Sequence, residues 1–258
     1  MKKETYPIVF CGAGPGDPEL ITVKGQRALQ RADLVLYTGS LVPESVLVWT
    51  AEHAERISSA AMNLDQIVAT LVQAHAAGKR VVRLHTGDPS LYGAIAEQMD
   101  ELDKHAVPYT VIPGVTAAFA AAASLGIEYT VPEKSQTLIL TRMAGRTPVP
   151  AAEDLALLAQ HKSSMAIYLS AALVDRVAEV LAESYGPDAP CAVAYKVSHP
   201  EEKIVMTRAA DLAGALRKAG IDRHALILVG PALGRRPDVD SVRSKLYDRG
   251  FSHGYRTS

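Results

Sequence analysis

Residues 84–93 read LHTGDPSLYG and begin at the last residue of an apolar run, 81–84. Glycine lets the backbone approach a ligand closely, while the proline locks its own φ and pushes Asp88 away from helical angles. The stretch therefore predicts a buried strand that ends in a tight turn, where carbonyl oxygens and one carboxylate converge. Because the proline also removes an N–H donor, the turn suits a polar or cationic ligand better than a phosphate.

Similar glycine–proline turns occur at 12–16 (GAGPG), 113–117 (PGVTA) and 230–233 (GPAL). The first is not a dinucleotide fingerprint, because its third glycine would fall at Asp17 and Pro15 interrupts the row of N–H donors. By itself it is equally well explained as a structural turn from strand to helix. All of these turns follow predicted strands, however, and open α/β sheets bind their ligands at the carboxyl ends of strands. The pattern therefore favours a ligand site.

Strand and helix patterns alternate along the first half of the chain, which predicts an α/β fold with a mostly parallel sheet. The second half is less regular. Its strands at 191–196 and 203–206 are separated by too few residues for a helical crossover, so we expect an antiparallel hairpin and a mixed sheet. The other expected strands are 8–11, 34–37, 81–84, 109–112, 137–141, 165–169 and 226–229, and the expected helices are 22–31, 64–77, 94–104 and 117–125.

A domain boundary is expected at 126–135, a segment that contains Pro132 and has no strong periodicity. This divides the chain into an N-terminal α/β domain at 1–125 and a C-terminal α/β domain with a tail at 136–258, with a cleft between them. The tail begins near residue 238 and contains Tyr247, Phe251 and Tyr255. It is expected either to dock on the body or a partner subunit or to fray.

Composition excludes several classes of protein. The 258 residues are 48% hydrophobic, which is enough for a sizeable core, and a net charge of −1 without a basic block argues against nucleic acid. No apolar stretch approaches the length of a membrane-spanning helix, and the polar start lacks the features of a signal peptide. Cys11 and Cys191 both lie in apolar runs, so buried reduced thiols are favoured over a disulfide or metal site. We therefore expect a soluble cytoplasmic protein.

Taken together, these motifs resemble the tetrapyrrole methylases, a family that uses S-adenosylmethionine in corrin and sirohaem biosynthesis. The resemblance extends over nearly the whole chain. The shared family motifs are GAGPGDP at 12–18 with LIT at 20–22, RLHTGDP at 83–89 and PGVTA at 113–117. The motifs TRMAGRTP at 141–148, YKVSHPEEKIV at 195–205 and RSKLYD at 243–248 resemble the branch that methylates carbon 11 of a corrin precursor, metal-free or cobalt-containing.

The resemblance implies a two-domain homodimer, with the cofactor folded in the interdomain cleft and the macrocycle in a trough beside it. Carbonyl groups near Gly87 and Asp88 could face the sulfonium and amino groups, while Leu91 and Leu169 could cover adenine. Asp88 is alternatively a turn or helix cap. The positions that match family contacts to S-adenosylmethionine are Pro15, Gly87, Asp88, Leu91, Thr116, Ala117 and Leu169 and, where the match depends on loop length, Ala194, Tyr195, Pro231 and Ala232.

The implied reaction needs alignment rather than a protein nucleophile, because an electron-rich carbon of the substrate attacks the methyl group. Some family members carry an acid/base Asp after the second strand and a Lys in the following loop. This chain has YTGS at 37–40 and ISSA at 57–60, so those roles are not transferred. No catalytic residue is assigned. His85 is a conceivable base, although a packed or hydrogen-bonded histidine is favoured.

Basic side chains are expected to bind the acetate and propionate arms that the family's substrates carry. The candidates are Arg142, Arg146, Lys196 and Lys203, each of which could instead be a solvated surface charge. Tyr92 and Tyr195 could stack on the macrocycle or stand over the sulfonium, and core packing is the equal alternative.

Two other functions remain open. The fold could serve a different methyl acceptor, such as a modified histidine on a protein or a ribose on RNA, but an RNA substrate would favour a basic face that the sequence lacks. The chain could also be a non-catalytic protein that only binds a tetrapyrrole or adenosyl ligand.

Overall fold

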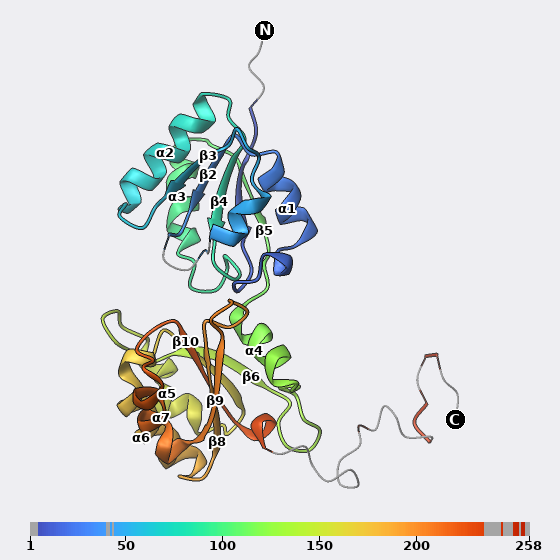
Figure 1. Cartoon of the computed structure of the whole chain (residues 1–258), viewed down its shortest axis with the longest axis vertical. Coiled ribbons are helices and arrows are strands. Elements are labelled where there is room, and N and C mark those ends of the chain that lie inside the picture. The colour runs from blue at the N-terminus through green and yellow to red at the C-terminus, as the bar shows by residue number, and fades with distance from the viewer. Residues whose placement is uncertain are drawn as a thin grey trace. The chain divides into compact units, whose positions relative to one another are not determined.

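The structure, a computed structural model, describes residues 5–39, 42, 44–234, 244, 250–252 and 254–255. The chain divides into two compact units (Figure 1). The first consists of Met1–Ala121 together with Lys196–Glu201, and the second of Ala122–Tyr195 together with Glu202–Ser258. The short segment Lys196–Glu201 thus belongs to the first unit, although the strands on either side of it belong to the second.

The first unit contains a five-stranded sheet in the order β3-β2-β4-β1-β5, in which every pairing is parallel. This confirms the predicted parallel sheet. The edge strand β3 was not expected, because its sequence ERIS is largely exposed and lacks an apolar signal. The elements are β1 (Ile8–Gly12), α1 (Val23–Gln30), β2 (Leu34–Tyr37), β3 (Glu55–Ser58), α2 (Leu64–Ala76), β4 (Val81–His85), α3 (Ile95–Lys104) and β5 (Tyr109–Ile112), with short 3-10 helices at Pro18–Leu20 and Glu44–Trp49.

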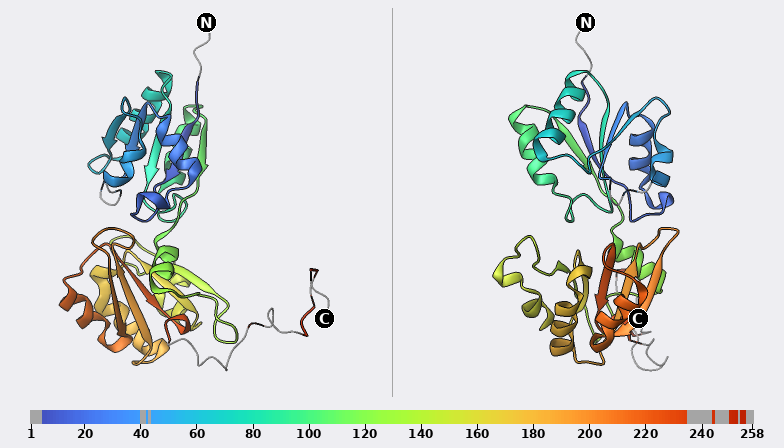
Figure 2. Two further views of the ribbon diagram at one scale, coloured as in Figure 1. Left: turned by 45° about the vertical axis from the view of Figure 1, so that its right-hand side comes forward. Right: turned by 60° about the vertical axis from the view of Figure 1, so that its left-hand side comes forward.

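Both faces of this sheet are covered, which explains why its central strands are continuous apolar runs. On one face, Leu29 of α1 and Val46 of the second 3-10 helix pack with Leu84 of β4. On the other, Leu71 of α2 and Leu102 of α3 pack with buried side chains that include β1 and β2 residues. Figure 2 shows α1 on one side of the sheet, and α2 and α3 on the other.

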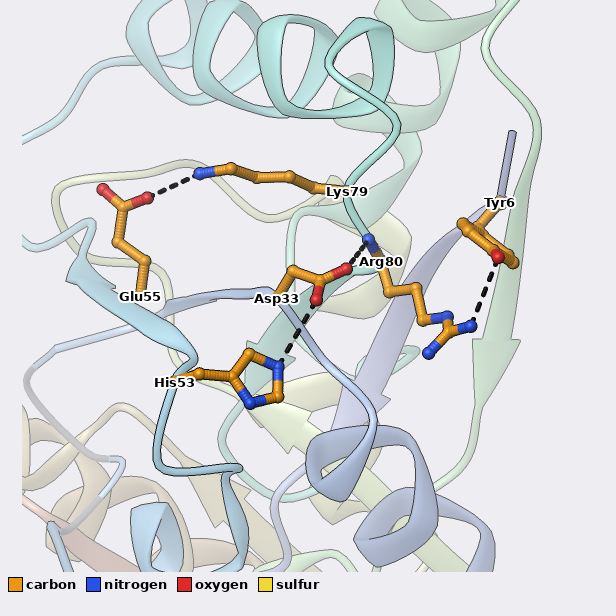
Figure 3. Close-up of polar contacts among 6 residues, drawn as sticks. All are labelled: Tyr6, Asp33, His53, Glu55, Lys79 and Arg80. Atoms are coloured by element: carbon orange, nitrogen blue, oxygen red, sulfur yellow. Dashed lines mark hydrogen bonds and ion pairs between the residues drawn. The ribbon is translucent and has the colours of Figure 1, made fainter. Parts of the chain in front are cut away.

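Polar contacts link the segments at the amino ends of the strands, at the edge opposite to the glycine turns (Figure 3). Asp33 accepts a hydrogen bond from the backbone N–H of Arg80 at 2.7 Å and lies 3.4 Å from His53 Nε2. The Arg80 guanidinium lies 4.6 Å from the centre of the Tyr6 ring. These side chains thus connect neighbouring strand starts at the end of the sheet away from the glycine turns. The group in Figure 3 comprises Tyr6, Asp33, His53, Glu55, Lys79 and Arg80.

The second unit contains a mixed five-stranded sheet in the order β6-β7-β10-β8-β9. Only β6 and β7 are parallel, and β8 and β9 form the predicted antiparallel hairpin. Side chains of α5, α6 and α7 form one core with the sheet. The elements are α4 (Ala117–Leu125), which spans the division, then β6 (Leu138–Arg142), α5 (Leu155–Ala159), β7 (Ser164–Tyr168), α6 (Val174–Tyr185), β8 (Pro190–Tyr195), β9 (Lys203–Arg208), α7 (Leu212–Ala219) and β10 (Ala225–Val229), with short 3-10 helices at Ala151–Glu153, Ala171–Leu173, Ala209–Asp211 and Pro231–Leu233.

The division between the units falls inside α4, between Ala121 and Ala122, rather than in the expected linker 126–135. The expected linker packs into the second unit instead. Ser164 donates its hydroxyl to the Tyr129 carbonyl at 2.7 Å, and its N–H donates to Ser135 Oγ at 3.1 Å. Because these hydrogen bonds fix the segment 126–135 to the second unit, it is not a flexible linker, although its lack of periodicity predicted one.

Both cysteines are free and buried, as expected, and burial raises the pKa of each thiol to about 12. In the part of the chain that is described, no helix combines the length and hydropathy needed to cross a membrane. The expected docking of the tail involves Tyr247, which lies outside the described residues. Phe251 and Tyr255 are 40% and 100% exposed.

Candidate functional site

Three glycine-containing turns pack on one another where the neighbouring strands β4, β1 and β5 end. Gly87 donates its N–H to the Gly14 carbonyl at 2.8 Å, and Gly14 donates back to the Gly87 carbonyl at 3.3 Å. A Cβ added to Gly12 or Gly114 would overlap the Gly87 carbonyl oxygen, which is backbone and cannot move aside. Gly14 and Gly87 also have φ of 79° and 63°, a region that favours glycine. These residues form a rigid backbone surface, which we call the glycine platform.

Asp88 fastens two of the turns together. Its Oδ2 accepts the Gly114 N–H at 2.9 Å, and its Oδ1 accepts the Ser90 N–H at 2.8 Å and also the Ser90 hydroxyl. Burial raises the pKa of this carboxyl, but the hydrogen bonds from Ser90 and Gly114 lower it by more, so the net pKa lies below the ordinary value. Asp88 therefore stabilises the turn, as the alternative interpretation proposed. An N–H or O–H group of a ligand would have to share carboxylate oxygens that already accept hydrogen bonds from Gly114 and Ser90.

The rest of this turn is strained. Tyr92 and Ala94 have φ of 57° and 48°, which non-glycine residues rarely adopt. A Cβ on Gly93 would overlap the Pro89 carbonyl. Leu91 is half-buried and Tyr92 is 44% exposed. Backbone strain of this kind is held at functional sites by the surrounding structure.

Buried polar side chains of β4 directly precede the turn, and their hydrogen bonds could not be predicted from the sequence. Arg83 donates to Gln98 Oε1 at 3.0 Å and to Ser59 Oγ at 2.9 Å. His85 is 2% exposed, and its Nε2 has no hydrogen-bond partner among the described residues. Burial, and then the Arg83 charge, lower the pKa of His85 to about 3. The centre of the His85 ring lies 5.9 Å from the centre of the Phe10 ring. The structure therefore disfavours His85 as a base near neutral pH and supports the packed alternative.

The remaining candidates of the first unit lie close to the glycine platform in sequence. Pro15 and Thr116 are buried, and Ala117 is half-buried as the first residue of α4. The Thr116 carbonyl accepts the N–H groups of Phe119 and Ala120 at 3.1 and 3.3 Å, which starts the helix. Thr116 therefore has a structural function at the start of α4, and direct contact of these three residues with a cofactor stays a prediction.

Strand register places most candidates of the second unit at one edge of its sheet. Arg142 pairs with Tyr168, after which Leu169 follows, and Tyr195 pairs with both Ala225 and Lys203. Leu169 has φ of 52° and is 67% exposed, an unusual state for a leucine. Tyr195 packs partly on the core of the unit, and Ala194 is 1% exposed.

Pro231 and Ala232 lie at the opposite edge of the same sheet. They follow β10, which runs antiparallel to β7 and β8, and its last residue, Val229, pairs with Met165 and Cys191 near the beginnings of those strands. The structure thus separates them from Leu169 and Tyr195. They line a cavity of about 450 Å³ instead, together with residues such as Ile127 and Met206 of the same unit.

The basic candidates differ in their surroundings. Arg142 donates to the carbonyls of Thr147 and Pro148 at 3.1 and 2.6 Å, so its guanidinium shapes the following loop. Arg146 is exposed in that loop, and Lys203 is exposed at the start of β9. Lys196 lies 3.4 Å from Glu201 Oε1. Among the described residues there is no group of His, Cys, Asp and Glu side chains that could hold a metal ion.

The geometry defines a class of protein: an α/β protein whose first unit offers a close-packed backbone surface at the carboxyl ends of parallel strands, where a polar organic ligand can bind. The chain belongs to the Tetrapyrrole (Corrin/Porphyrin) Methylases, whose family profile matches residues 7–213.

Individual relatives agree with this assignment. The chain is 50% identical over 252 residues to a cobalt-precorrin-4 C(11)-methyltransferase of Methanocaldococcus jannaschii, covering 97% of this chain and 96% of that protein. It is 45% identical over 249 residues to a precorrin-4 C(11)-methyltransferase of Pseudomonas aeruginosa, covering 96% and 98%.

Solved structures are similar as well. A crystal structure of the cobalamin biosynthetic enzyme cobalt precorrin-4 methyltransferase matches with a TM-score of 0.86 and 46% identity, covering 89% of this chain and 96% of that one. Uroporphyrin-III C-methyl transferase from Thermus thermophilus, complexed with S-adenyl homocysteine, matches with a TM-score of 0.72 and 27% identity, covering 89% and 94%. The resemblance stated from the motifs is therefore confirmed.

Proposed function

We propose that this chain transfers the methyl group of S-adenosylmethionine to carbon 11 of precorrin-4, giving S-adenosylhomocysteine and precorrin-5 during assembly of the corrin ring of cobalamin. The same reaction on cobalt-precorrin-4 is the alternative. The glycine platform is the observation that supports this proposal most directly, together with relatives of both names that align over nearly the whole chain.

The platform suits the donor because the glycines let three turns pack on one another as bare backbone, whose polar groups can face a ligand. The donor supplies a methyl group on a positively charged sulfur: a bond forms from the substrate carbon to the methyl carbon, and the carbon–sulfur bond breaks with its electron pair left on sulfur. Protein groups are needed to align the two reactants, which can contribute about 7–11 kcal/mol. Contacts of the donor with Pro15, Gly87 and Leu91 belong to this proposal.

We assign the further donor contacts of the resemblance in the same way, to Thr116, Ala117, Leu169, Ala194 and Tyr195. Contacts of the donor with Pro231 and Ala232, which β10 carries to the other end of the second sheet, stay predictions.

For the substrate, the proposed partners of the carboxylate arms are Arg146, Lys196 and Lys203, because guanidinium and ammonium groups bind carboxylates through charge-assisted hydrogen bonds. Arg142 contributes by holding the loop that carries Arg146. Tyr92 is exposed enough to stack on a flat ring.

Assembly and location are part of the same proposal. Val111 of the edge strand β5 and Phe119 of α4 are 41% and 55% exposed, and such apolar side chains support a homodimer. Light scattering should give twice the mass of one chain. The two free thiols support a reducing compartment, the cytoplasm.

The deciding experiment incubates the purified protein with methyl-labelled S-adenosylmethionine and either metal-free or cobalt-containing precorrin-4. The expected result is label in the pigment at carbon 11, located by mass spectrometry and carbon NMR. Faster turnover of one pigment identifies the substrate form. Binding of both ligands without transfer of label would support the non-catalytic alternative and contradict the proposal.

A further inference from the structure

We infer that the segment Lys196–Glu201, here called the hairpin loop, positions the donor-binding turn 14–17, and that Ser198 is its main positioning residue. The inference rests on the proposed function, since it assigns a role toward the donor site. The motif at 195–205 carried no such role in the sequence.

The hairpin loop contacts the turn directly. Ser198 Oγ accepts a hydrogen bond from the backbone N–H of Asp17 at 3.0 Å, although the two residues are 181 positions apart in sequence. Asp17 in turn accepts the Glu19 N–H at 2.8 Å and caps the short helix Pro18–Leu20. The hydroxyl of Ser198 therefore fixes the backbone directly after Pro15 and Gly16.

His199 makes a second contact with the same turn. A Cβ on Gly16 would overlap the His199 imidazole at Cδ2 and lie 2.7 Å from Nε2. Gly16 has no left-handed φ, so its backbone conformation does not demand glycine. An added Cβ at position 16 would therefore meet the imidazole unless the ring moved, which shows how closely the two segments approach.

The hairpin loop itself is held in an unfavourable conformation. Lys196 and Ser198 have φ of 43° and 65°, in the left-handed region where non-glycine residues are strained. The His199 N–H donates to the Lys196 carbonyl at 3.0 Å, and Val197 is 4% exposed. Glycine would adopt this φ without strain, so what serine offers in its place at position 198 is the hydroxyl that accepts the Asp17 N–H.

The turn 14–17 is itself hydrogen-bonded to other parts of the glycine platform. Gly14, three residues before Asp17 in the same turn, exchanges hydrogen bonds with Gly87, and Asp88 next to it holds Gly114. A shift of the backbone at Asp17 therefore acts on the surface assigned to the donor. A purely structural contact would affect stability and leave donor affinity unchanged, which separates the two roles experimentally.

The test measures the affinity for S-adenosylhomocysteine by calorimetry. Ser198→Gly removes the hydroxyl without adding backbone strain, and we expect the dissociation constant to rise by about tenfold, the factor equivalent to ~1.4 kcal/mol for one unmade hydrogen bond. With saturating donor, kcat should stay within about twofold while KM for the donor rises. Ser198→Asn restores an acceptor at a position that tolerates left-handed φ, and it should recover most of the affinity.

The matched control is Lys162→Gly, which removes an exposed side chain from another position with left-handed φ, 52°, in the second unit and should leave the affinity unchanged. A second route uses Gly16→Ala, alone and combined with His199→Ala. The added methyl should weaken donor binding by itself and less so once the imidazole is removed. This cycle tests the contact even where a serine variant folds poorly.

The outcomes are distinguishable. If the unchanged protein does not bind S-adenosylhomocysteine, the proposed function fails. If it binds, but Ser198→Gly lowers only the melting temperature and leaves the affinity within twofold, the hairpin loop is a structural fastening and the inference is overturned.

Discussion

Replacing Asp88 by Asn tests the hydrogen bonds with which this carboxylate joins two turns of the glycine platform. The carboxylate accepts the Gly114 N–H on one oxygen and the Ser90 N–H and hydroxyl on the other. An amide keeps only one oxygen, so at least one of these N–H groups must face an NH₂ group. Losing one such bond to a charged acceptor costs about 1–2 kcal/mol, after a discount for partial exposure.

The loss should be visible in urea denaturation followed by the fluorescence of the single tryptophan, Trp49, which lies in the first unit. Asp88→Asn should lower the free energy of unfolding of that unit and weaken S-adenosylhomocysteine binding. Asp100→Asn, on the exposed surface of α3, removes a charge without these bonds and should change neither quantity measurably.

The effect of Asp88→Asn on the free energy of unfolding should also depend on pH. Hydrogen bonds lower the pKa of Asp88 in the folded chain, so its stabilisation is present above the unfolded value of about 3.9 and is lost as pH falls through the folded value. The difference in unfolding free energy between the two proteins should stay constant from pH 7 to 5 and shrink in more acidic solution. Equal stability at every pH would refute the reasoning.

Further predictions concern three positions. Gly114→Ala places a methyl group on immovable backbone, so it should destabilise the first unit by about 1–3 kcal/mol in denaturation and abolish detectable donor binding; a stable variant that binds normally would contradict the packing. Arg142→Lys cannot reach the carbonyls of Thr147 and Pro148 with one planar group, so KM for the pigment should rise severalfold while KM for the donor stays constant in steady-state kinetics. His85→Gln should leave the pH dependence of kcat between pH 6 and 8 unchanged, because a histidine with a pKa near 3 is neutral there; a missing ionisation would restore His85 as a base.

Local sequence was sufficient for most elements. The apolar runs at 34–37 and 109–112 predicted β2 and β5 with their observed bounds, and the short spacing after β8 predicted the hairpin. The strand β3 was missed because an exposed edge strand needs few apolar residues. The linker was misplaced because weak periodicity does not reveal hydrogen bonds to distant residues such as Ser164.

For the site, the glycine and proline residues predicted which turns take part, since backbone conformation near these residues depends on the residues themselves. Their mutual packing was not visible in sequence, because it depends on strand order in the sheet. Which end of the second sheet Pro231 and Ala232 occupy depends on the direction of β10. The contact of Ser198 with Asp17 depends on two segments that are 181 residues apart in sequence and meet only in the folded chain. Turns and apolar strands are encoded within a few neighbouring residues, whereas register, strand direction and long-range contacts exist only once the whole sheet has assembled.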